Sequence, residues 1–296
     1  MKKILLLIAI FLGCFLSWYF LLKPYDYLVS LEPKTFPGAV NQSIKTWNLT
    51  LDNSSLSKSD DLLALNQLIT YGDSVFLYEW RLEAINDSTT FVKVYVTDQS
   101  HSFQNRLNNL FFYTDFEKRV KNSLTEFNSN LKQHISRFKV KIVGEDHINK
   151  TYCAFIRISG PQGEKAVGMM QNFSLLTSTL VEKNIELDGR PFIEVIDWDM
   201  TNDYITYDFC YPIKNKEDRF DHSLIHFREV TPRKALKAIY NGNYITSDRA
   251  WYALVDYAAA QNITIDKKPF EVFHNNPNMG GDELQWQAEI FMPIKE

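Results

Sequence analysis

Two carboxylates occupy matching positions near the ends of two similar stretches of the chain. Asp208 lies four residues before Pro212, and Glu289 lies four residues before Pro293. Apolar residues alternate around each acid, which predicts a strand with the acid on the face opposite its apolar side chains. Two acids that face one cleft could attract a cation, or could share general acid/base work if their pKa values differ.

The two acids belong to a duplicated stretch. The first copy is residues 185–213 and the second is residues 263–294. Each copy opens with Ile-x-(Leu/Ile)-Asp, continues with a basic residue and Pro-Phe, and ends in Pro-Ile. Such an internal repeat predicts one supersecondary unit that is used twice. If the two units pair about a pseudo-twofold axis, their acid-bearing faces line one shared cleft.

The second half of the chain, expected to form a domain at 146–296, resembles the GyrI-like (AraC-type) effector-binding domain. The phrase Ala-Glu-Ile-Phe-Met-Pro-Ile at 288–294 carries most of the likeness, and the stretch at 238–244 is similar to the family's approach to its second unit. The resemblance implies a duplicated β-α-β-β domain with a pseudo-twofold cleft. It also implies that Glu289 lies at the bottom of the cleft, with a lipophilic or cationic small molecule as ligand.

Aromatic residues are expected to form the walls of this cleft. Flat or cationic ligands suit aromatic walls. The plainer alternative is that each ring belongs to a core, where aromatic side chains are usually found. The candidates, together with the acids Glu289 and Asp208, are Tyr204, Tyr244, Trp251 and Phe291.

Two other functions are compatible with the same residues. Glu289 could activate water for the hydrolysis of a reactive small molecule, with Asp208 as a second acid. Alternatively, the domains could be packing surfaces with a structural or interaction role, in which case the cleft would be filled by its own side chains. The sequence favours ligand binding without turnover, and no catalytic residue is assigned.

The N-terminal residues 4–22 carry no charge, with Lys2 and Lys3 before them and Lys23 after them. Such a run is close to the length that spans a bilayer core of ~30 Å. We expect residues 1–24 to form a single-pass transmembrane anchor, with the bulk of the chain on the extracytoplasmic side. A cleaved signal peptide is the alternative, although its apolar region would normally be shorter.

The segment at 25–145 is expected to form a domain of its own. A short strand, an early helix, paired strands at 75–82 and 90–96, and a long helix at 114–134 follow in that order. This order resembles the SRPBCC/START-like fold, in which a curled antiparallel sheet wraps a long helix. The whole chain is therefore expected to be α+β: a transmembrane helix, a START-like domain and a duplicated effector-binding domain.

Charge and cysteine content narrow the classes of partner. The net charge of −4 argues against a nucleic-acid partner, which usually requires a basic surface. No Cys/His cluster predicts a metal site, and no cofactor is expected. Cys153 and Cys210 fall on predicted strands, so a disulfide between them is conceivable but is not supported by their spacing. The sequence leaves the oligomeric state open.

Overall fold

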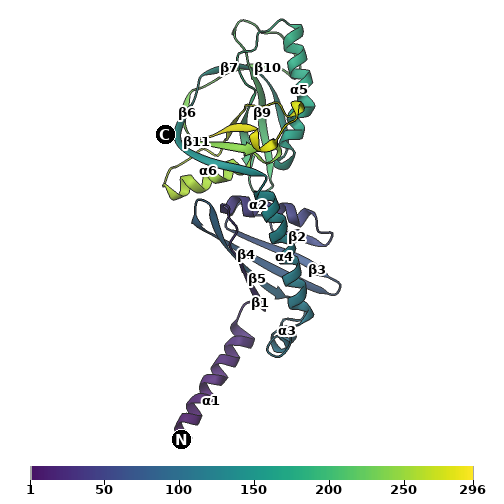
Figure 1. The fold of residues 1–296 in the computed structure, drawn as a ribbon, viewed down its shortest axis with the longest axis vertical. Helices are drawn as coiled ribbons and strands as arrows, with labels where there is room; N and C mark the ends of the chain where they lie inside the picture. The colour runs from purple at the N-terminus through teal and green to yellow at the C-terminus, as the bar shows by residue number, and fades with distance from the viewer. Residues whose placement is uncertain (1, 296) are drawn as a thin grey trace. The chain divides into compact units, whose positions relative to one another are not determined.

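The chain folds into two compact units. The computed structural model describes residues 2–295, apart from the side chains of Lys2, Leu5 and Leu21, so Met1 of the expected anchor and Glu296 of the expected C-terminal domain lie outside it. The first unit contains the chain up to residue 57 together with 61–132, and the second contains 58–60 and the chain from 133 onward. Figure 1 labels their elements.

The expected transmembrane anchor is wrong. The N-terminal helix α1 (Lys2–Ser17) has 16 residues and is followed by a π-helix, η1 (Trp18–Leu22). Sixteen residues rise about 24 Å, which falls short of a bilayer core of ~30 Å. No helix among residues 2–295 is long and apolar enough to cross a membrane. This finding also overturns the expected single-pass membrane localisation.

The residues that follow α1 contact helix α3 (Ser102–Asn108) of the same unit. Arg106, on α3, donates hydrogen bonds to the backbone oxygens of Tyr19 (3.4 Å) and Phe20 (3.2 Å). The rings of Phe20 and Phe103 lie 5.5 Å apart. Counting uncharged residues therefore overestimated the length of the straight helix.

The first unit is one antiparallel sheet with helices packed on it. The strands lie in the order β1-β5-β4-β3-β2. They are β1 (Tyr27–Leu31), β2 (Ser54–Leu56), β3 (Ala64–Tyr71), β4 (Ser74–Asn86) and β5 (Thr89–Asp98). The helices are α2 (Pro37–Leu49), α3 and α4 (Asp115–Ile135), and α4 runs along the sheet in Figure 1. Its buried residues follow the three- and four-residue spacing that favours a helix at 114–134: Phe116, Val120, Leu124, Phe127 and Leu131.

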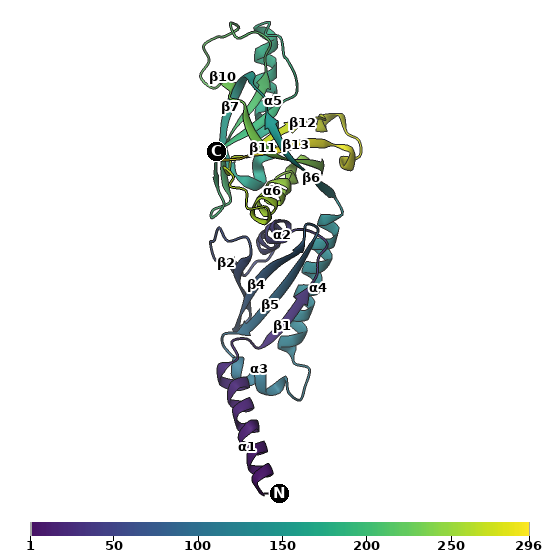
Figure 2. The same ribbon diagram turned by 90° about the vertical axis from the view of Figure 1, so that its left-hand side faces the viewer.

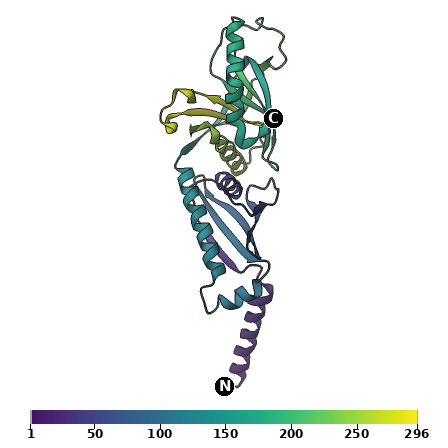
Figure 3. The ribbon, with the colours of Figure 1, turned by 90° about the vertical axis from the view of Figure 1, so that its right-hand side faces the viewer.

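The second unit is built on an eight-stranded antiparallel sheet. Its strands lie in the order β10-β7-β9-β8-β12-β13-β11-β6. They are β6 (Phe138–Ile148), β7 (Thr151–Pro161), β8 (Phe192–Asp199), β9 (Tyr204–Pro212), β10 (His226–Val230), β11 (Arg233–Gly242), β12 (Phe270–Phe273) and β13 (Gln287–Pro293). Helix α5 (Lys165–Glu182) contacts β7, and α6 (Arg249–Ala260) contacts β6, β11 and β13. The segment between β12 and β13, drawn in yellow, projects from the side of this unit in Figures 2 and 3.

The predicted fold class is corrected accordingly. The structure is α+β with two antiparallel sheets, of five and eight strands, and its described residues contain no membrane-spanning helix. The expected combination of a transmembrane helix, a START-like domain and an effector-binding domain is wrong as stated.

Short connections curl the larger sheet. Strands β6 and β7 lie towards opposite edges of the sheet, yet only two residues join them, and the same holds for β10 and β11. Two residues allow at most about 11 Å between the strand ends, so the flanks of the sheet must converge there. An apolar cluster occupies the face that this curl encloses: Ile148, Cys153, Phe155, Phe192, Cys210, Val230, Ala235, Phe270 and Phe291.

The two copies of the repeat share their backbone geometry. The residue after the Ile-x-(Leu/Ile) opening donates to the carbonyl of the closing proline in both: Asp188 to Pro212 (2.9 Å) and Asp266 to Pro293 (2.8 Å). The rings of Phe192 and Phe270, which start β8 and β12, stack with centroids 4.6 Å apart. The equivalent residues of the two copies therefore meet on the enclosed face of one sheet.

Candidate ligand-binding site

A hollow of about 240 Å³ opens beside Glu289 on the enclosed face of the second unit. Glu289 and Phe291 reach it from β13, and Phe270 and Val272 from β12. These side chains share a face because residues two apart on a strand point the same way. The other lining residues are His147, Ile148, Asn149, Thr151, Asp188, Gly189, Arg190, Phe192 and Pro212.

The Glu289 carboxylate has one lysine and one histidine as neighbours but keeps some access to solvent. Its side chain is 26% exposed. Lys237 Nζ lies 3.4 Å from Glu289 Oε2, and His274 Nε2 lies 3.6 Å from Oε1. Lys237 also lies 3.1 Å from an Asp146 carboxylate oxygen and 5.0 Å from the centre of the Phe291 ring. Lys237 therefore bridges two acids.

His274 favours the neutral form. Its burial, and then the positive charge of Arg190, lower the pKa of the imidazole, although Glu289 acts in the opposite direction. The Arg190 guanidinium lies 3.3 Å from His274 Nε2, and because arginine can only donate, the imidazole nitrogen accepts. Arg190, His274 and Glu289 thus form a chain of contacts along the edge of the hollow.

Asp208 has surroundings quite unlike those of Glu289. Its side chain is fully buried and accepts two hydrogen bonds from Arg157, at 2.8 and 3.1 Å. Arg228 Nε lies 3.1 Å from the same carboxylate. Glu194 binds Arg228 and Arg233 next to it. Burial alone would raise the pKa of Glu194, but these two arginines hold it below its usual value.

The predicted aromatic residues are placed in three different environments. Phe291 lines the Glu289 hollow, whereas Tyr244 is buried, lines a second groove and donates to the Gln287 carbonyl at 2.7 Å. Trp251 is fully buried, with Lys165 Nζ 4.8 Å from its ring. Tyr204 is 44% exposed. Neither Tyr204, Trp251 nor Asp208 lines either hollow.

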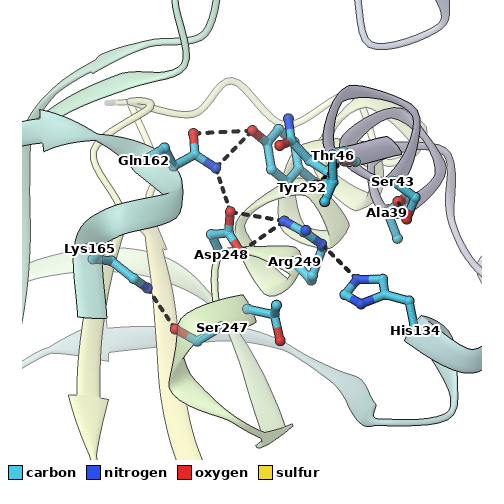
Figure 4. A network of polar contacts seen from close by, with 12 residues as sticks. Ala39, Ser43, Thr46, His134, Gln162, Lys165, Ser247, Asp248, Arg249 and Tyr252 are labelled. Carbon is cyan, nitrogen blue, oxygen red and sulfur yellow. Dashed lines mark hydrogen bonds and ion pairs between the residues drawn. The ribbon is translucent and has the colours of Figure 1, made fainter. Parts of the chain in front are cut away.

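A buried polar network connects the starts of the two helices that precede the repeat copies, on the helical side of the sheet (Figure 4). Lys165 Nζ, at the start of α5, lies 2.6 Å from Ser247 Oγ, just before α6, and 2.6 Å from Glu271 Oε1 on β12 of the second copy. Gln162 likewise donates to Asp248 at 2.6 Å. The side chains of Lys165 and Glu271 are completely buried. Although serine beside lysine can form a nucleophile, this burial leaves no path for a substrate, so the network stabilises the pairing of the repeats.

The cysteines and the potential metal ligands add no further site. Cys153 and Cys210 are both free and buried. Burial, and then the neighbouring Cys153, raises the pKa of the Cys210 thiol well above its usual value. Across residues 2–295, no group of three or more His, Cys, Asp or Glu side chains is placed to hold a metal ion.

Some key residues of this site were missed by the sequence analysis. Lys237 and Asp146 belong to β11 and β6, which precede the second repeat copy, and Arg228 belongs to β10. No local pattern around these three residues marks them as neighbours of Glu289 or Asp208. Pairing between strands far apart in sequence decided which acid each of them would meet.

Comparison with known proteins shows similarity at the level of the fold. No family model and no curated protein matches the sequence. The chain is similar to the EcmrR C-terminal domain, at 13% identity and a TM-score of 0.45, over 54% of this chain and 98% of that one. It is similar to SAV2435 bound to tetraphenylphosphonium, at 12% identity and a TM-score of 0.36, over 53% and 93%. It is also similar to a hydrolase from Listeria innocua, at 10% identity and a TM-score of 0.34, over 51% and 92%.

Proposed function

We propose that the second unit binds a small lipophilic cation in the hollow beside Glu289. One observation carries the proposal: a partly exposed carboxylate stands in a hollow whose other walls include the rings of Phe270 and Phe291. A carboxylate attracts a positive charge, and aromatic faces favour cations and apolar groups alike. The hollow is small for a drug-sized molecule, so part of such a ligand would remain outside it.

Lys237 supplies the mechanism by which charge would select the ligand. Its ammonium neutralises Glu289 from 3.4 Å while making a shorter contact, 3.1 Å, with Asp146. An incoming cation can take over Glu289 while Lys237 keeps Asp146, so no charge is left without a partner. A neutral ligand of the same shape gains nothing from this exchange. Binding therefore favours cations, and raised ionic strength weakens it.

The test is calorimetric titration of the full chain with tetraphenylphosphonium and with the neutral triphenylphosphine oxide. The first probe is chosen because a protein of similar fold has been solved with it. We expect the cation to bind more tightly, and we expect Glu289→Gln to weaken its binding about tenfold or more, which corresponds to about 1.4 kcal/mol.

The matched control is Glu145→Gln. Glu145 is an exposed acid on β6 of the same unit and lies outside the hollow. This variant should bind like the unchanged protein. Equal binding of the two probes, or equal affinities of the Glu289 and Glu145 variants, would remove the basis of the proposal.

A further inference from the structure

A second, larger groove lies in the same unit on the helical side of the sheet. Its volume is about 360 Å³, within the range of about 300–1,000 Å³ usual for small-molecule sites. It lies between α5 and the segments that follow β11 and β12. The lining residues are Ala166, Met169, Met170, Phe173, Gly189, Arg190, Pro191, Phe209, Tyr211, Asn243, Tyr244, Ile245, Phe273, His274, Asn275, Asn276, Pro277, Asn278 and Trp286.

The charge of this groove is opposite to that of the Glu289 hollow. Within residues 2–295 no aspartate or glutamate lines it, and Arg190 is the one lysine or arginine in its walls. Among the described residues Arg190 contacts the His274 nitrogen but has no carboxylate partner. Because the pKa of His274 is lowered by burial and by Arg190, the imidazole adds no second positive charge near neutral pH. The groove therefore offers one uncompensated guanidinium.

The remaining walls are apolar and adaptable. Met169, Met170 and Phe173 reach the groove from α5, and Trp286 reaches it from the turn before β13. Met170 and Ile245 are 64% and 51% exposed. Exposed apolar side chains gathered around a concave surface mark a place where another apolar group binds, and methionine fits irregular ligand shapes well.

We infer that this groove binds a lipophilic monocarboxylate, with its apolar body against the methionines and Trp286 and its carboxylate on Arg190. A guanidinium matches a carboxylate with two parallel hydrogen bonds. A single arginine balances a single negative charge, which favours a monoanion over a phosphate dianion. Asn275 adds a donor, because its Oδ1 is already used by the Gln287 N–H at 2.8 Å and its amide nitrogen remains for an anion. Arg190 also borders the Glu289 hollow, but the two ligands are opposite in charge and the methionines and Trp286 line only the larger groove, so the two proposals can be tested separately.

The test is titration of the full chain with decanoate and 2-naphthoate, each compared with its neutral analogue, decanol or 2-naphthol. Calorimetry gives the affinities, and tryptophan fluorescence reports contact with Trp286. We expect each carboxylate to bind at least about tenfold more tightly than its alcohol. Arg190→Gln should abolish that difference while leaving the affinity for the alcohols unchanged.

Two further variants keep the result interpretable. Arg219→Gln removes an exposed arginine of the same unit that does not line the groove, and it should change nothing. Met169→Asp places a negative charge in the groove and should weaken the binding of acids and alcohols together. Folding of every variant is checked by circular dichroism. Equal affinity for acid and alcohol, no binding of either, or an Arg190→Gln variant that still prefers acids would overturn the inference.

The same variants separate the two proposals. Decanoate should bind the Glu289→Gln variant as tightly as the unchanged protein, because Glu289 does not line the larger groove. If Glu289→Gln weakens the binding of tetraphenylphosphonium and of decanoate equally, there is one site rather than two, and the inference about the larger groove fails.

Discussion

Two acids at matching positions of the repeat differ in their exposure to solvent. Glu289 is partly exposed and faces one lysine and one histidine, whereas Asp208 is fully buried between two arginines. A carboxylate whose hydrogen bonds are already satisfied by guanidinium groups has little to offer a ligand. The same position in the repeat therefore supports binding in one copy and structure in the other.

The structural role of Asp208 predicts a large loss of stability in Asp208→Asn. The substitution keeps the shape of the side chain but removes the charge that faces Arg157 and Arg228. We expect a loss of about 3 kcal/mol in the free energy of unfolding, measured by urea titration. Glu186→Gln, which breaks an exposed pair with Lys214, should cost less than about 1 kcal/mol. Similar losses in the two variants would show that the buried ion pairs contribute little.

A buried histidine predicts acid sensitivity between pH 6.5 and 4. Burial, and then the positive charge of Arg249, lowers the pKa of His134 from 6.5 to about 4. The unfolded chain therefore binds this proton more readily than the folded chain, so its contribution to stability is complete above pH 6.5 and is lost as the pH falls towards 4. A shift of this size corresponds to about 3 kcal/mol at most.

The measurement is the free energy of unfolding at several pH values for the unchanged protein and for His134→Gln. Between pH 6.5 and 4 the free energy of unfolding of the variant should fall less steeply than that of the unchanged protein. The difference in slope should approach the value that the uptake of one proton produces. Parallel curves for the two proteins would contradict the assignment of this transition to His134.

At the scale of elements, both helices of the repeat end in the same way. Asn184 after α5 and Asn262 after α6 have φ values of 56° and 55°, in the left-handed region. The next residue then donates to a helix carbonyl in each copy, Ile185 to Leu180 and Ile263 to Ala258, both at 2.9 Å. An asparagine directly precedes the opening isoleucine of both copies in the sequence, and it could have extended the predicted repeat backwards into the helix ends.

This helix end predicts a contrast between two substitutions of Asn184. Glycine adopts the left-handed conformation freely, so Asn184→Gly should leave the melting temperature unchanged or slightly raised. Valine is strained there, and Asn184→Val should cost about 1–2 kcal/mol. Calorimetric melting of both variants checks the prediction, and an equal effect of glycine and valine would contradict it.

The sequence predicted elements well where one pattern decided them. The spacing of apolar residues from Phe116 to Leu131 predicts α4. The alternation of side chains along β13 predicts that Glu289 lies on the face opposite Ala288 and Ile290. Strand β3 was missed because it follows a Ser- and Asp-rich loop and its own residues include two polar amides. Its place in the sheet depends on pairing with β4, which no local pattern reveals.

Across the whole molecule, the length of an uncharged run is a poor guide to the length of its helix, as the N-terminus shows. The uncharged run is long enough to span a bilayer, but α1 ends at Ser17 and the following turn binds Arg106. The expected boundary between residues 145 and 146 falls inside β6, whereas the two units divide inside α4. The predicted domain bounds 25–145 and 146–296 stay predictions, whereas the membrane anchor expected at 1–24 is wrong.

The repeat itself was the most informative feature of the whole sequence. It predicted that equivalent residues of two segments meet, and Phe192 and Phe270 do stack. It did not predict that the two faces of the sheet would carry hollows with different charged groups. That property depends on Lys237 on β11, Arg190 before β8 and His274 after β12, which acquire their neighbours only through the fold.

The proposed replacement of Lys237 by a ligand cation at Glu289 can be tested by one double-mutant cycle. Tetraphenylphosphonium affinity is measured by calorimetry for the unchanged chain, Lys237→Met, Glu289→Gln and the combination. Removal of the competing lysine should tighten binding about tenfold when Glu289 is present and should have little effect in the Glu289→Gln background. If Lys237→Met tightens binding equally in both backgrounds, or weakens it, Glu289 is not the group for which the cation competes, and the account is wrong.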